Sequence, residues 1–529
     1  MEYGHWLPLS SQGREYLRDE SRREGSAEQI AFPRSEADII ACLRDCSAKH
    51  CRVTVQGGRT GLAAGAVPDG GRIINLARMD GMNGMAESSD GAFLLKVQPG
   101  LTLLALRQAL TTKKIDTSGW DEVSKAIYQE FLKSGEWFFT PDPTEATATI
   151  GGMAACNASG ARSYLYGATR GHIEALRMAL ADGRMMEIRR GTCFAQGLQA
   201  RYPLLDGGML KAVIPGYKMP DCKNASGYFA SPDMDLIDLL IGSDGTLGVI
   251  TELELKLMQV PAVIWGASLL MPDEHSAMAL AQRLRHSKLP LAAIEYFDGG
   301  ALDILREQKK EGGAFGALSD VGCDIGAVIY CELHCKDEGE AREVLLALGE
   351  LCAACGGAEK NTWVARNDTD RDRLLFFRHA VPESVNMRID RRRQVSADIV
   401  KVASDIAVPE EHFGELVNFY RETLAESGLE SATWGHIGDC HLHVNMLPRS
   451  HDELLTAKSL LMRWAKAAAS MGGAVSAEHG VGKLKRDYLR TMYGDDGIAQ
   501  SALVKRAFDP ENRLGAGNLF DPSEVTVCE

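Results

Sequence analysis

Histidine and acidic residues that could bind a metal ion gather toward the end of the chain. Three histidines stand at positions 436, 441 and 443, and Glu478 and His479 follow downstream. Imidazole nitrogens and carboxylate oxygens are common ligands of transition-metal ions. His436 and His443 are an odd number of residues apart and would face opposite ways on one straight strand, but Gly438-Asp439 supplies a turn that lets both point at one ion. Ordinary polar histidines beside a turn would produce the same pattern, so both interpretations stay open at this point.

Glycine-rich segments are the second feature that could do chemistry. The chain has 54 glycines in 529 residues, which exceeds the usual share of about 7%. Three dense blocks lie at Gln56–Gly61, Ala148–Arg162 and Gly242–Glu252. Glycine at a strand end exposes successive backbone N–H groups, and such a concavity binds phosphate, although glycine also serves bare turns. Neither a Rossmann GxGxxG in its strand–helix frame nor a P-loop is present, so a nucleotide cofactor would need another scaffold.

Composition argues against several classes of protein. Fifty-eight Lys and Arg residues against 72 Asp and Glu residues give a formal net charge of −14, whereas nucleic-acid binding needs a basic surface. The longest apolar stretches, such as 262–271, fall short of the ~20 residues that cross a bilayer, and the charged N-terminus is unlike a signal peptide. We therefore expect a cytoplasmic protein whose 13 cysteines are reduced thiols.

The candidate residues must be positioned by two α+β units. In the first third, Ser35 and Asp38 predict the capped start of a helix. Short strands are expected there at 52–55, 72–76 and 93–97, followed by a charged helical insertion at 121–133. After Pro261, strands are expected at 263–270, 291–297 and 325–333 and helices at 275–286 and 338–352. This second set predicts a sheet with helices on one face.

The glycine blocks resemble the signatures of a known flavoprotein family. Val55–Gly61, Ala148–Gly152 with Asn157–Arg162, and Gly242–Gly248 are similar to the FAD-binding motifs of the vanillyl-alcohol-oxidase/para-cresol-methylhydroxylase flavoproteins, over about residues 15–520. The branch is that of the D-2-hydroxy-acid dehydrogenases. The resemblance implies an α+β fold with a two-subdomain FAD-binding domain, an α+β ferredoxin-like cap domain and a C-terminal helical tail. The FAD domain would span 1–257 with an insertion at about 118–137, the cap with the metal site 258–490, and the segment returning to the FAD domain 491–529.

The resemblance implies that residues of the glycine blocks hold FAD. The residues carried over are Gln56, Gly57, Gly58, Arg59, Thr60, Gly61, Pro141, Thr149, Ile150, Gly151, Gly152, Asn157, Ser159, Gly160, Tyr166, Gly167, Asp244, Gly245 and Ile250. Asp244 stands where the family commonly has Glu, and Gly515–Gly517 stands where it has Asn-Pro-Gly, which removes one polar contact. The first loop offers Arg59 rather than the histidine to which some relatives bond FAD, so non-covalent FAD is expected.

The resemblance also assigns the histidine cluster. Metal-dependent members of the branch read His-x-Gly-Asp-Gly-Asn-x-His and Ser-x-Glu-His-Gly, so the matching metal ligands are His436, His443 and Glu478, and His479 matches the catalytic base. Cys440 and His441 replace Gly and Asn, and His441 could instead be a ligand or a substrate contact. Zinc is the first choice of metal, with manganese or iron as alternatives. The substrate-binding candidates are Arg378, Lys401 and Asn445, where a surface ion pair and a solvated lysine are the plain alternatives for the two cations.

These residues predict the FAD-dependent oxidation of a small D-2-hydroxy acid, such as D-lactate, glycolate or D-2-hydroxyglutarate, to the 2-oxo acid. The C2 hydride would pass to flavin N5, a metal would activate the hydroxyl group, and His479 would accept its proton. One alternative is a flavoprotein subunit with an electron-transfer or scaffold role. Another is a non-redox enzyme like the ether-lipid synthase, which the intact Glu478-His479 pair disfavours. We expect a quinone, an electron-transfer flavoprotein or an iron–sulfur subunit as electron acceptor. A homodimer and a peripheral place at the inner face of a membrane stay open.

Overall fold

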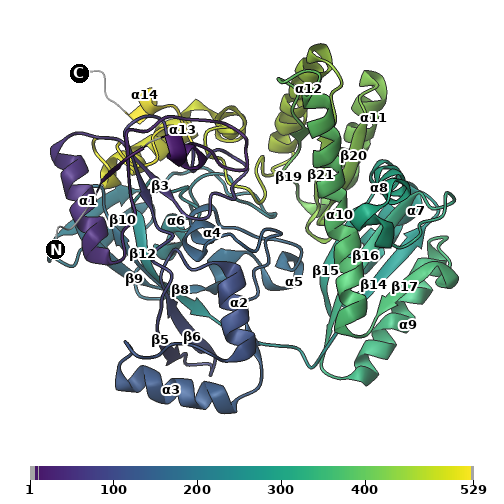
Figure 1. Ribbon diagram of the computed structural model, residues 1–529, viewed down its shortest axis with the longest axis horizontal. Coiled ribbons are helices and arrows are strands. Elements are labelled where there is room, and N and C mark those ends of the chain that lie inside the picture. Colours follow the sequence, from purple (N-terminus) through teal and green to yellow (C-terminus); the bar gives the residue numbers. More distant parts are fainter. Residues whose placement is uncertain (1–5, 10, 526–529) are drawn as a thin grey trace.

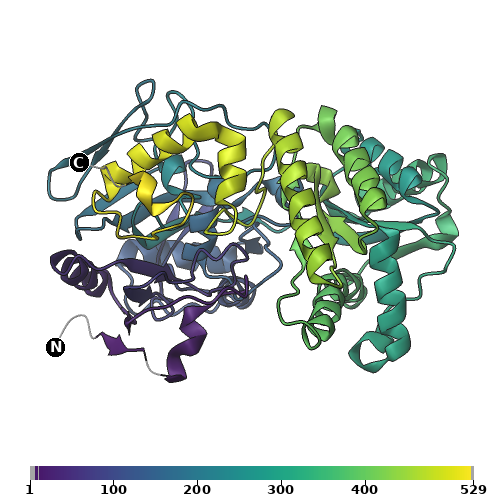
Figure 2. The same cartoon turned by 90° about the horizontal axis from the view of Figure 1, so that it is seen from above.

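The computed structural model describes residues 6–9 and 11–525. The chain forms two lobes that lie side by side (Figure 1). The N-terminal half builds the first lobe, and the segment from β14 (Val263–Met271) to α12 (His451–Ser470) builds the second. The last helices, α13 (Arg486–Phe508) and α14 (Pro522–Val525), return to the first lobe (Figure 2). Within the described residues, no helix combines the length and apolar character needed to cross a membrane.

A small, mainly parallel sheet begins the first lobe. Its strands lie in the order β1 (Leu7–Pro8), β2 (Gln29–Ala31), β4 (Arg72–Asn75) and β3 (Val53–Gln56), and only β1 is antiparallel to its neighbour. Helix α1 (Glu36–Ala48) packs against this sheet. The Ser35 hydroxyl accepts a hydrogen bond from the Asp38 N–H, and the Asp38 carboxylate accepts one from the Ser35 N–H. This capping box confirms the predicted helix start.

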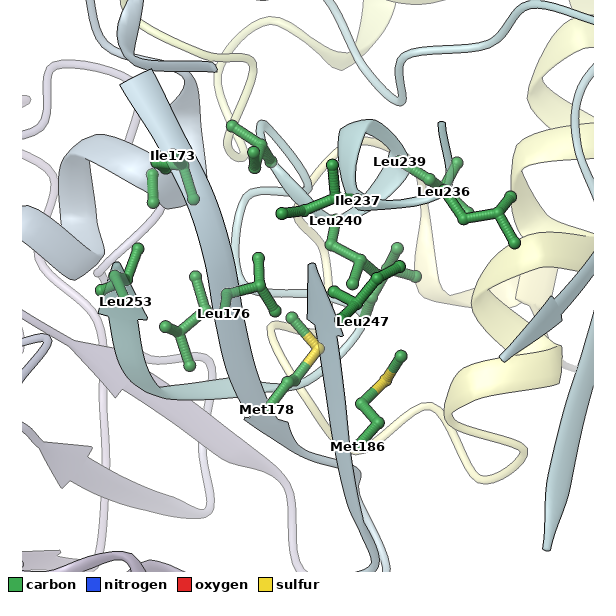
Figure 3. Close-up of a cluster of buried hydrophobic side chains, with 14 of the residues drawn as sticks. Ile173, Leu176, Met178, Met186, Leu236, Ile237, Leu239, Leu240, Leu247 and Leu253 are labelled. Atoms are coloured by element: carbon green, nitrogen blue, oxygen red, sulfur yellow. The ribbon is translucent and has the colours of Figure 1, made fainter. Parts of the chain in front are cut away.

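The second sheet of the first lobe is antiparallel and carries its main core. The strand order is β5 (Met82–Glu87), β6 (Phe93–Val97), β12 (Val249–Lys256), β8 (Ile173–Ala179) and β9 (Met185–Arg189). Figure 3 shows Leu176 and Met186 of this sheet packed near Leu240 of α6 (Ile237–Leu240). Leu489 and Phe508 of α13 belong to the same core, so the end of the chain is built into the first lobe.

Several further elements of the first lobe lie around this sheet. They are α2 (Leu103–Thr112), α3 (Glu122–Lys133), the pair β10 (Gln199–Pro203) and β11 (Met209–Val213), and the pair β7 (Trp137–Phe138) and β13 (Met258–Gln259). The expected helix at 121–133 is confirmed as α3, which begins after the Asp121 cap. Phe131 of α3 is fully buried in the core, so the inner side of this helix contributes to the fold.

The second lobe is built on a sheet of eight strands. Their order is β17 (Thr362–Ala365), β14, β16 (Ala327–Cys335), β15 (Leu291–Phe297), β20 (Ser431–Gly435), β21 (His441–Met446) and β18 (Val402–Ala403), with β19 (Ile406–Ala407) also paired to β21. One face packs against α7 (Glu274–His286), α9 (Glu338–Ala354), α11 (Glu410–Ser427) and α12, and the other against α8 (Gly299–Glu311) and α10 (Asp368–Arg393). The two predicted helices, α7 and α9, share one face as expected, but α8 and α10 cover the other face, so the expected sheet with helices on one face is corrected to a sheet covered on both. Neighbouring residues Leu269 and Leu270 are both buried, each in a different core, because this strand is sandwiched between two helical layers.

The C-terminal segment contains the helix α13, which bends at Gly494, where φ is 69°. Lys505 is buried, and its ammonium donates hydrogen bonds to the Asp509 carboxylate and to two backbone carbonyls. The α+β fold class with a second lobe and a C-terminal helical tail is confirmed, whereas the domain boundaries at 257/258 and 490/491 stay predictions.

Candidate functional site

The three glycine blocks meet at one cavity of the first lobe. The first block follows β3, the second begins α4 (Ile150–Cys156), and the third precedes β12. The predicted cofactor-binding residues that line the cavity are Gly57, Gly58, Arg59, Thr60, Gly61, Thr149, Gly151, Gly152, Ser159, Asp244, Gly245 and Ile250. Glu478 and His479 line the same cavity, so it reaches the predicted chemical centre.

Other predicted cofactor-binding residues lie outside this lining. They are Gln56, Pro141, Ile150, Asn157, Gly160, Tyr166 and Gly167. The buried Gln56 amide donates hydrogen bonds to two backbone carbonyls and so fixes the first glycine loop. Asn157 adopts the left-handed conformation, with φ 50°, that ends α4. The Tyr166 hydroxyl lies 2.6 Å from Nδ1 of His334 in the second lobe, so its hydroxyl joins the lobes.

Two polar atoms that the glycine blocks contribute to the cavity wall lack a hydrogen-bond partner among the described residues. Arg59 Nη1 and Ser159 Oγ are buried and form no hydrogen bond within the described part of the chain. The Arg59 guanidinium lies 4.3 Å from the centroid of the Tyr16 ring, and its Nη2 lies 4.0 Å from Glu15 Oε2. Because buried polar groups are normally hydrogen-bonded, the wall offers a cation and a hydroxyl to a polar ligand.

Asp244 connects the cavity to the segment that follows His479. Its Oδ2 accepts hydrogen bonds from the N–H groups of Val481, at 2.9 Å, and Gly482, at 2.8 Å. Burial raises the pKa of Asp244 to about 6, although these two hydrogen bonds oppose the shift. The aspartate that stands in place of the family's glutamate therefore holds protein backbone next to the predicted base.

Asn518, which follows the segment Gly515–Gly517, connects two loops of the cavity lining. The Asn518 amide donates hydrogen bonds to the carbonyl oxygens of Gly65, at 3.1 Å, and Asp244, at 2.9 Å. Its Oδ1 accepts a hydrogen bond from Lys483 Nζ at 2.8 Å. The Asn518 side chain thus holds together loops that line the cavity.

The histidine cluster lies on the hairpin of β20 and β21 in the second lobe. A 3-10 turn spans Ile437–Asp439, and Cys440 adopts a left-handed conformation (φ 53°) before β21 begins, which confirms the predicted turn. His436, His441, His443 and Glu478 each offer one ligand atom, and these atoms lie within 4.8 Å of one another. His436 Nε2 lies 3.0 Å and His441 Nδ1 3.5 Å from Glu478 Oε2.

Glu295 on β15 connects this cluster to Arg378 on α10. Its Oε1 lies 2.6 Å from His436 Nδ1, and its Oε2 lies 3.1 Å from Arg378 Nε. Although burial opposes ionisation, Arg378 and His436 hold the pKa of Glu295 below its usual value. Against its own burial, the pKa of His436 is raised to about 9 by Glu295 and Glu478. Sequence reasoning missed Glu295; the available signal was one acidic residue in an otherwise apolar strand.

Asp405, directly before β19, positions His479. Its Oδ2 lies 3.3 Å from His479 Nδ1 and accepts a hydrogen bond from the His479 N–H at 3.1 Å. Although burial opposes ionisation, His479 and Lys485 hold the pKa of Asp405 well below its usual range. With Nδ1 occupied, the His479 ring leaves its Nε2 free, 3.9 Å from Glu478 Oε1. Sequence reasoning considered this segment for Lys401 and missed Asp405.

Asn445 and Lys223 contact residues of the cluster, and Lys401 directly precedes β18, which pairs with β21. Asn445 is buried, and its amide donates a hydrogen bond to the His443 carbonyl at 2.9 Å. Lys401 forms no hydrogen bond or ion pair with the residues that the structure describes, and burial, then Arg22, lowers its pKa to about 8. Lys223, which sequence reasoning also missed, lies 3.1 Å from Glu478 Oε2 and 3.5 Å from Asp439 Oδ2.

Two family models match the chain. One, described as an FAD binding domain, matches residues 27–118 and 126–189. The other, described as the C-terminal domain of FAD linked oxidases, matches residues 260–519. Together they cover most of the chain, in the order that the sequence resemblance implied.

Similar curated proteins carry the names of oxidoreductases. The D-lactate dehydrogenase of Anaerostipes hadrus is 26% identical over 515 residues, which covers 96% of this chain and 92% of that protein. The D-2-hydroxyglutarate dehydrogenase of Stutzerimonas stutzeri is 25% identical over 501 residues (93% and 90%), and the glycolate oxidase subunit GlcD of Bacillus subtilis is 24% identical over 505 residues (94% and 91%). A solved structure of alkyldihydroxyacetonephosphate synthase has a TM-score of 0.59 at 12% identity and covers 96% of this chain and 81% of that one, which shows a shared fold.

Proposed function

Because the chain belongs to the FAD-linked oxidases and is an oxidoreductase, we propose that it oxidises a small D-2-hydroxy acid to the 2-oxo acid. FAD would occupy the cavity of the first lobe, and a divalent metal would be held by His436, His443 and Glu478. D-lactate, glycolate and D-2-hydroxyglutarate are the candidate substrates, because relatives named for them match almost the whole chain. The observation that carries the proposal is the position of His479, which lines the cavity and stacks on His443 with ring centroids 5.3 Å apart.

The cavity wall fits FAD. A Cβ added at Gly245 would meet no atom within 4 Å, and one added at Gly61 would meet only Asp19 Oδ2 at 4.0 Å, so a ligand can approach the backbone at both places. The unpartnered Arg59 and Ser159 atoms lie in the same wall. When bound, FAD supplies the acceptor for a hydride. Because Arg59 stands where some relatives have a bonding histidine, we propose that the FAD is non-covalent.

The donor atoms of the cluster fit a divalent metal ion. Imidazole nitrogens with one carboxylate oxygen are a ligand set that zinc, manganese and iron accept. Glu478 Oε2 is buried and forms no hydrogen bond of good geometry within the described part of the chain, although His436 Nε2 lies 3.0 Å and Lys223 Nζ 3.1 Å away. A metal ion held there would activate the substrate hydroxyl as a Lewis acid.

His479 is the base in this proposal. The Asp405 carboxylate fixes its Nδ1, so Nε2 is the atom that takes the hydroxyl proton. Histidine is suited to this transfer because its usual pKa lies near neutral pH. The planar guanidinium of Arg378 suits a carboxylate, and Lys401 offers a second cation without an ion-pair partner in the described residues. The Asn445 amide holds the backbone at His443.

His479→Ala tests the assignment of the base. The variant should keep its FAD, measured by the visible spectrum, and lose flavin reduction by the hydroxy acid, because a general base contributes about 10²–10⁴-fold to such a step. His275→Ala, on the exposed surface of α7, is the matched control. Reduction of the His479→Ala flavin at a near-wild-type rate would remove His479 from the mechanism.

Chelation tests the metal separately from the flavin. Removing bound metal should suppress flavin reduction by the substrate, and adding zinc or manganese should restore it. Metal analysis of the same samples gives the occupancy at each stage. Unchanged reduction in protein that contains no metal would remove the metal from the proposal and leave the flavin chemistry in place.

A further inference from the structure

We propose that His441 is a fourth protein ligand, so that the metal site of this chain consists of three imidazoles and one carboxylate. The inference rests on the proposed function, which includes a bound metal ion. It adds the identity of the four protein ligands and the class of metal that they fit. The related sequence pattern has asparagine where this chain has His441. The substitution therefore replaces an amide with a strong nitrogen ligand.

The position of His441 within the cluster is that of a ligand. Its side chain is fully buried, and its Nδ1 lies 3.5 Å from Glu478 Oε2. Its ring centroid lies 5.5 Å from that of His436 and 4.5 Å from that of His443. One ligand atom from each of these four residues lies within 4.8 Å of the others, so one ion can bridge them.

Each of the three imidazoles has one nitrogen that faces a protein acceptor outside the cluster. His436 Nδ1 lies 2.6 Å from Glu295 Oε1, His441 Nε2 lies 3.0 Å from Asp405 Oδ1, and His443 Nδ1 lies 3.2 Å from the Ser404 carbonyl oxygen. This leaves one nitrogen of each ring free. Metal-bound histidines characteristically place their second nitrogen against a carboxylate or a carbonyl, which orients the ring. All three histidines, His441 included, show this arrangement.

A substrate contact is the weaker interpretation of His441. The predicted base His479, at the cavity wall, is 27% exposed, whereas the side chain of His441 is 0% exposed. Within the described part of the chain, His441 Nδ1 forms no hydrogen bond, and Nε2 faces Asp405 Oδ1 at 3.0 Å without good hydrogen-bond geometry. A buried polar side chain left in that state is costly, and coordination by its Nδ1 would satisfy it.

The charged side chains around the cluster are compatible with the binding of a metal cation. The facing carboxylates are Glu295, Asp405, Asp439 and Glu478, and the facing cations are Lys223, Arg378 and Lys485. Lys223 is the cation that competes for Glu478, at 3.1 Å from its Oε2. Its Nζ also donates a hydrogen bond to the Gly160 carbonyl and lies 3.5 Å from Asp439, so these contacts remain when a metal ion takes Glu478.

Four protein ligands change which metal fits the reaction. A tetrahedral zinc site is already filled by four ligands. A 2-hydroxy acid that binds through its hydroxyl and one carboxylate oxygen needs two more positions. Six-coordinate ions such as Mn²⁺ or Fe²⁺ provide them, so the structure favours manganese or iron over zinc.

Metal binding by the full-length flavoprotein tests the inference. Metal-depleted wild type, His441→Asn and the surface control His275→Asn are titrated with Mn²⁺, and the absorption of bound Co²⁺ reports the coordination number. We expect His441→Asn to lose at least about 100-fold in Mn²⁺ affinity, since even outer partners of a ligand contribute 10–100-fold. Wild type should give the weak Co²⁺ absorption of a six-coordinate ion. His275→Asn should match wild type, and the flavin spectrum of all three should be unchanged.

Different outcomes separate this inference from the proposed function. Equal Mn²⁺ affinity in wild type and His441→Asn, with both folded, would overturn the fourth ligand and leave the three-ligand metal site standing. Intense tetrahedral Co²⁺ absorption in wild type would overturn the six-coordinate class. Absence of metal binding in wild type would overturn both this inference and the metal part of the proposed function. If His441→Asn does not fold, pulsed EPR of Cu²⁺ in wild type counts the imidazole ligands: three support the inference, and two contradict it.

Discussion

Asp405→Asn should slow flavin reduction while the protein keeps its FAD. The carboxylate contacts His479 twice, at Nδ1 (3.3 Å) and at the backbone N–H (3.1 Å), and the side-chain contact leaves Nε2 as the free ring nitrogen. A hydrogen bond to a charged group contributes about 1.5–3 kcal/mol, which corresponds to about a 10- to 150-fold loss in rate if it acts in the transition state. Asparagine keeps the size of the side chain but removes the negative charge that faces His479 and Lys485.

Stopped-flow measurement of flavin bleaching without oxygen checks this prediction. Asp398→Asn is the matched control, because Asp398 also lies against a histidine, 2.7 Å from His451 Nδ1, but on the exposed surface. The rate constant for reduction should fall in Asp405→Asn and stay at the wild-type value in Asp398→Asn. Wild-type reduction by a folded, flavin-loaded Asp405→Asn variant would refute the argument that Asp405 positions the base.

Three further perturbations test other contacts. Arg378→Met should raise KM for the hydroxy acid about 10- to 100-fold, since one charge-assisted hydrogen bond to the carboxylate is lost; steady-state kinetics measures this, and an unchanged KM would exclude Arg378 from substrate binding. Burial lowers the pKa of Lys401 to about 8, so its charge is present below that pH and lost above it. The KM for the hydroxy acid should therefore rise above about pH 8 in wild type and show no such rise in Lys401→Met. Burial raises the pKa of the Asp244 carboxyl to about 6, so its ionised form costs folding free energy. Asp244→Asn should therefore stabilise the flavin-free protein by on the order of 2–3 kcal/mol above about pH 6 and by little below about pH 4. Urea unfolding at two pH values checks the last prediction, and equal stability of variant and wild type at neutral pH would contradict it.

The cavity residues were the part of the site that the sequence predicted most directly. Gly57–Gly61 directly follow a strand, where a glycine loop works through its own backbone, so local sequence indicated a binding loop there. The turn at Ile437–Asp439 was predictable for the same reason, because glycine and aspartate favour turns. These residues needed no knowledge of distant segments.

The residues that hold the histidines were not predictable in this way. Glu295 lies far from His436 in the sequence, and the pairing of β15 with β20 brings the two together. Asp405 lies beside His479 because Ala407, two residues later, forms a β-bridge with Ala474, which is again a tertiary contact. Sequence periodicity describes one element at a time, so it carries no information about which elements become neighbours.

Helix α10 illustrates a second limit of structure prediction from local sequence. Pro382 lies inside this 26-residue helix, although proline usually ends or bends a helix because it lacks an N–H donor. Buried contacts of Phe377 and Val381 with the second face of the sheet hold the segment helical. Tertiary packing therefore decided the conformation of the segment that carries Arg378, against its local signal.

Flavin reduction by defined hydroxy acids is the most direct test of the proposed FAD-dependent oxidation of a small D-2-hydroxy acid. Purified, metal-loaded protein is titrated without oxygen with D-lactate, L-lactate, glycolate and D-2-hydroxyglutarate while the flavin absorbance is followed. We predict bleaching by at least one of D-lactate, glycolate and D-2-hydroxyglutarate, no bleaching by L-lactate, and loss of the bleaching in His479→Ala. A flavin that none of these acids bleaches, in protein with FAD and metal both bound, would contradict it.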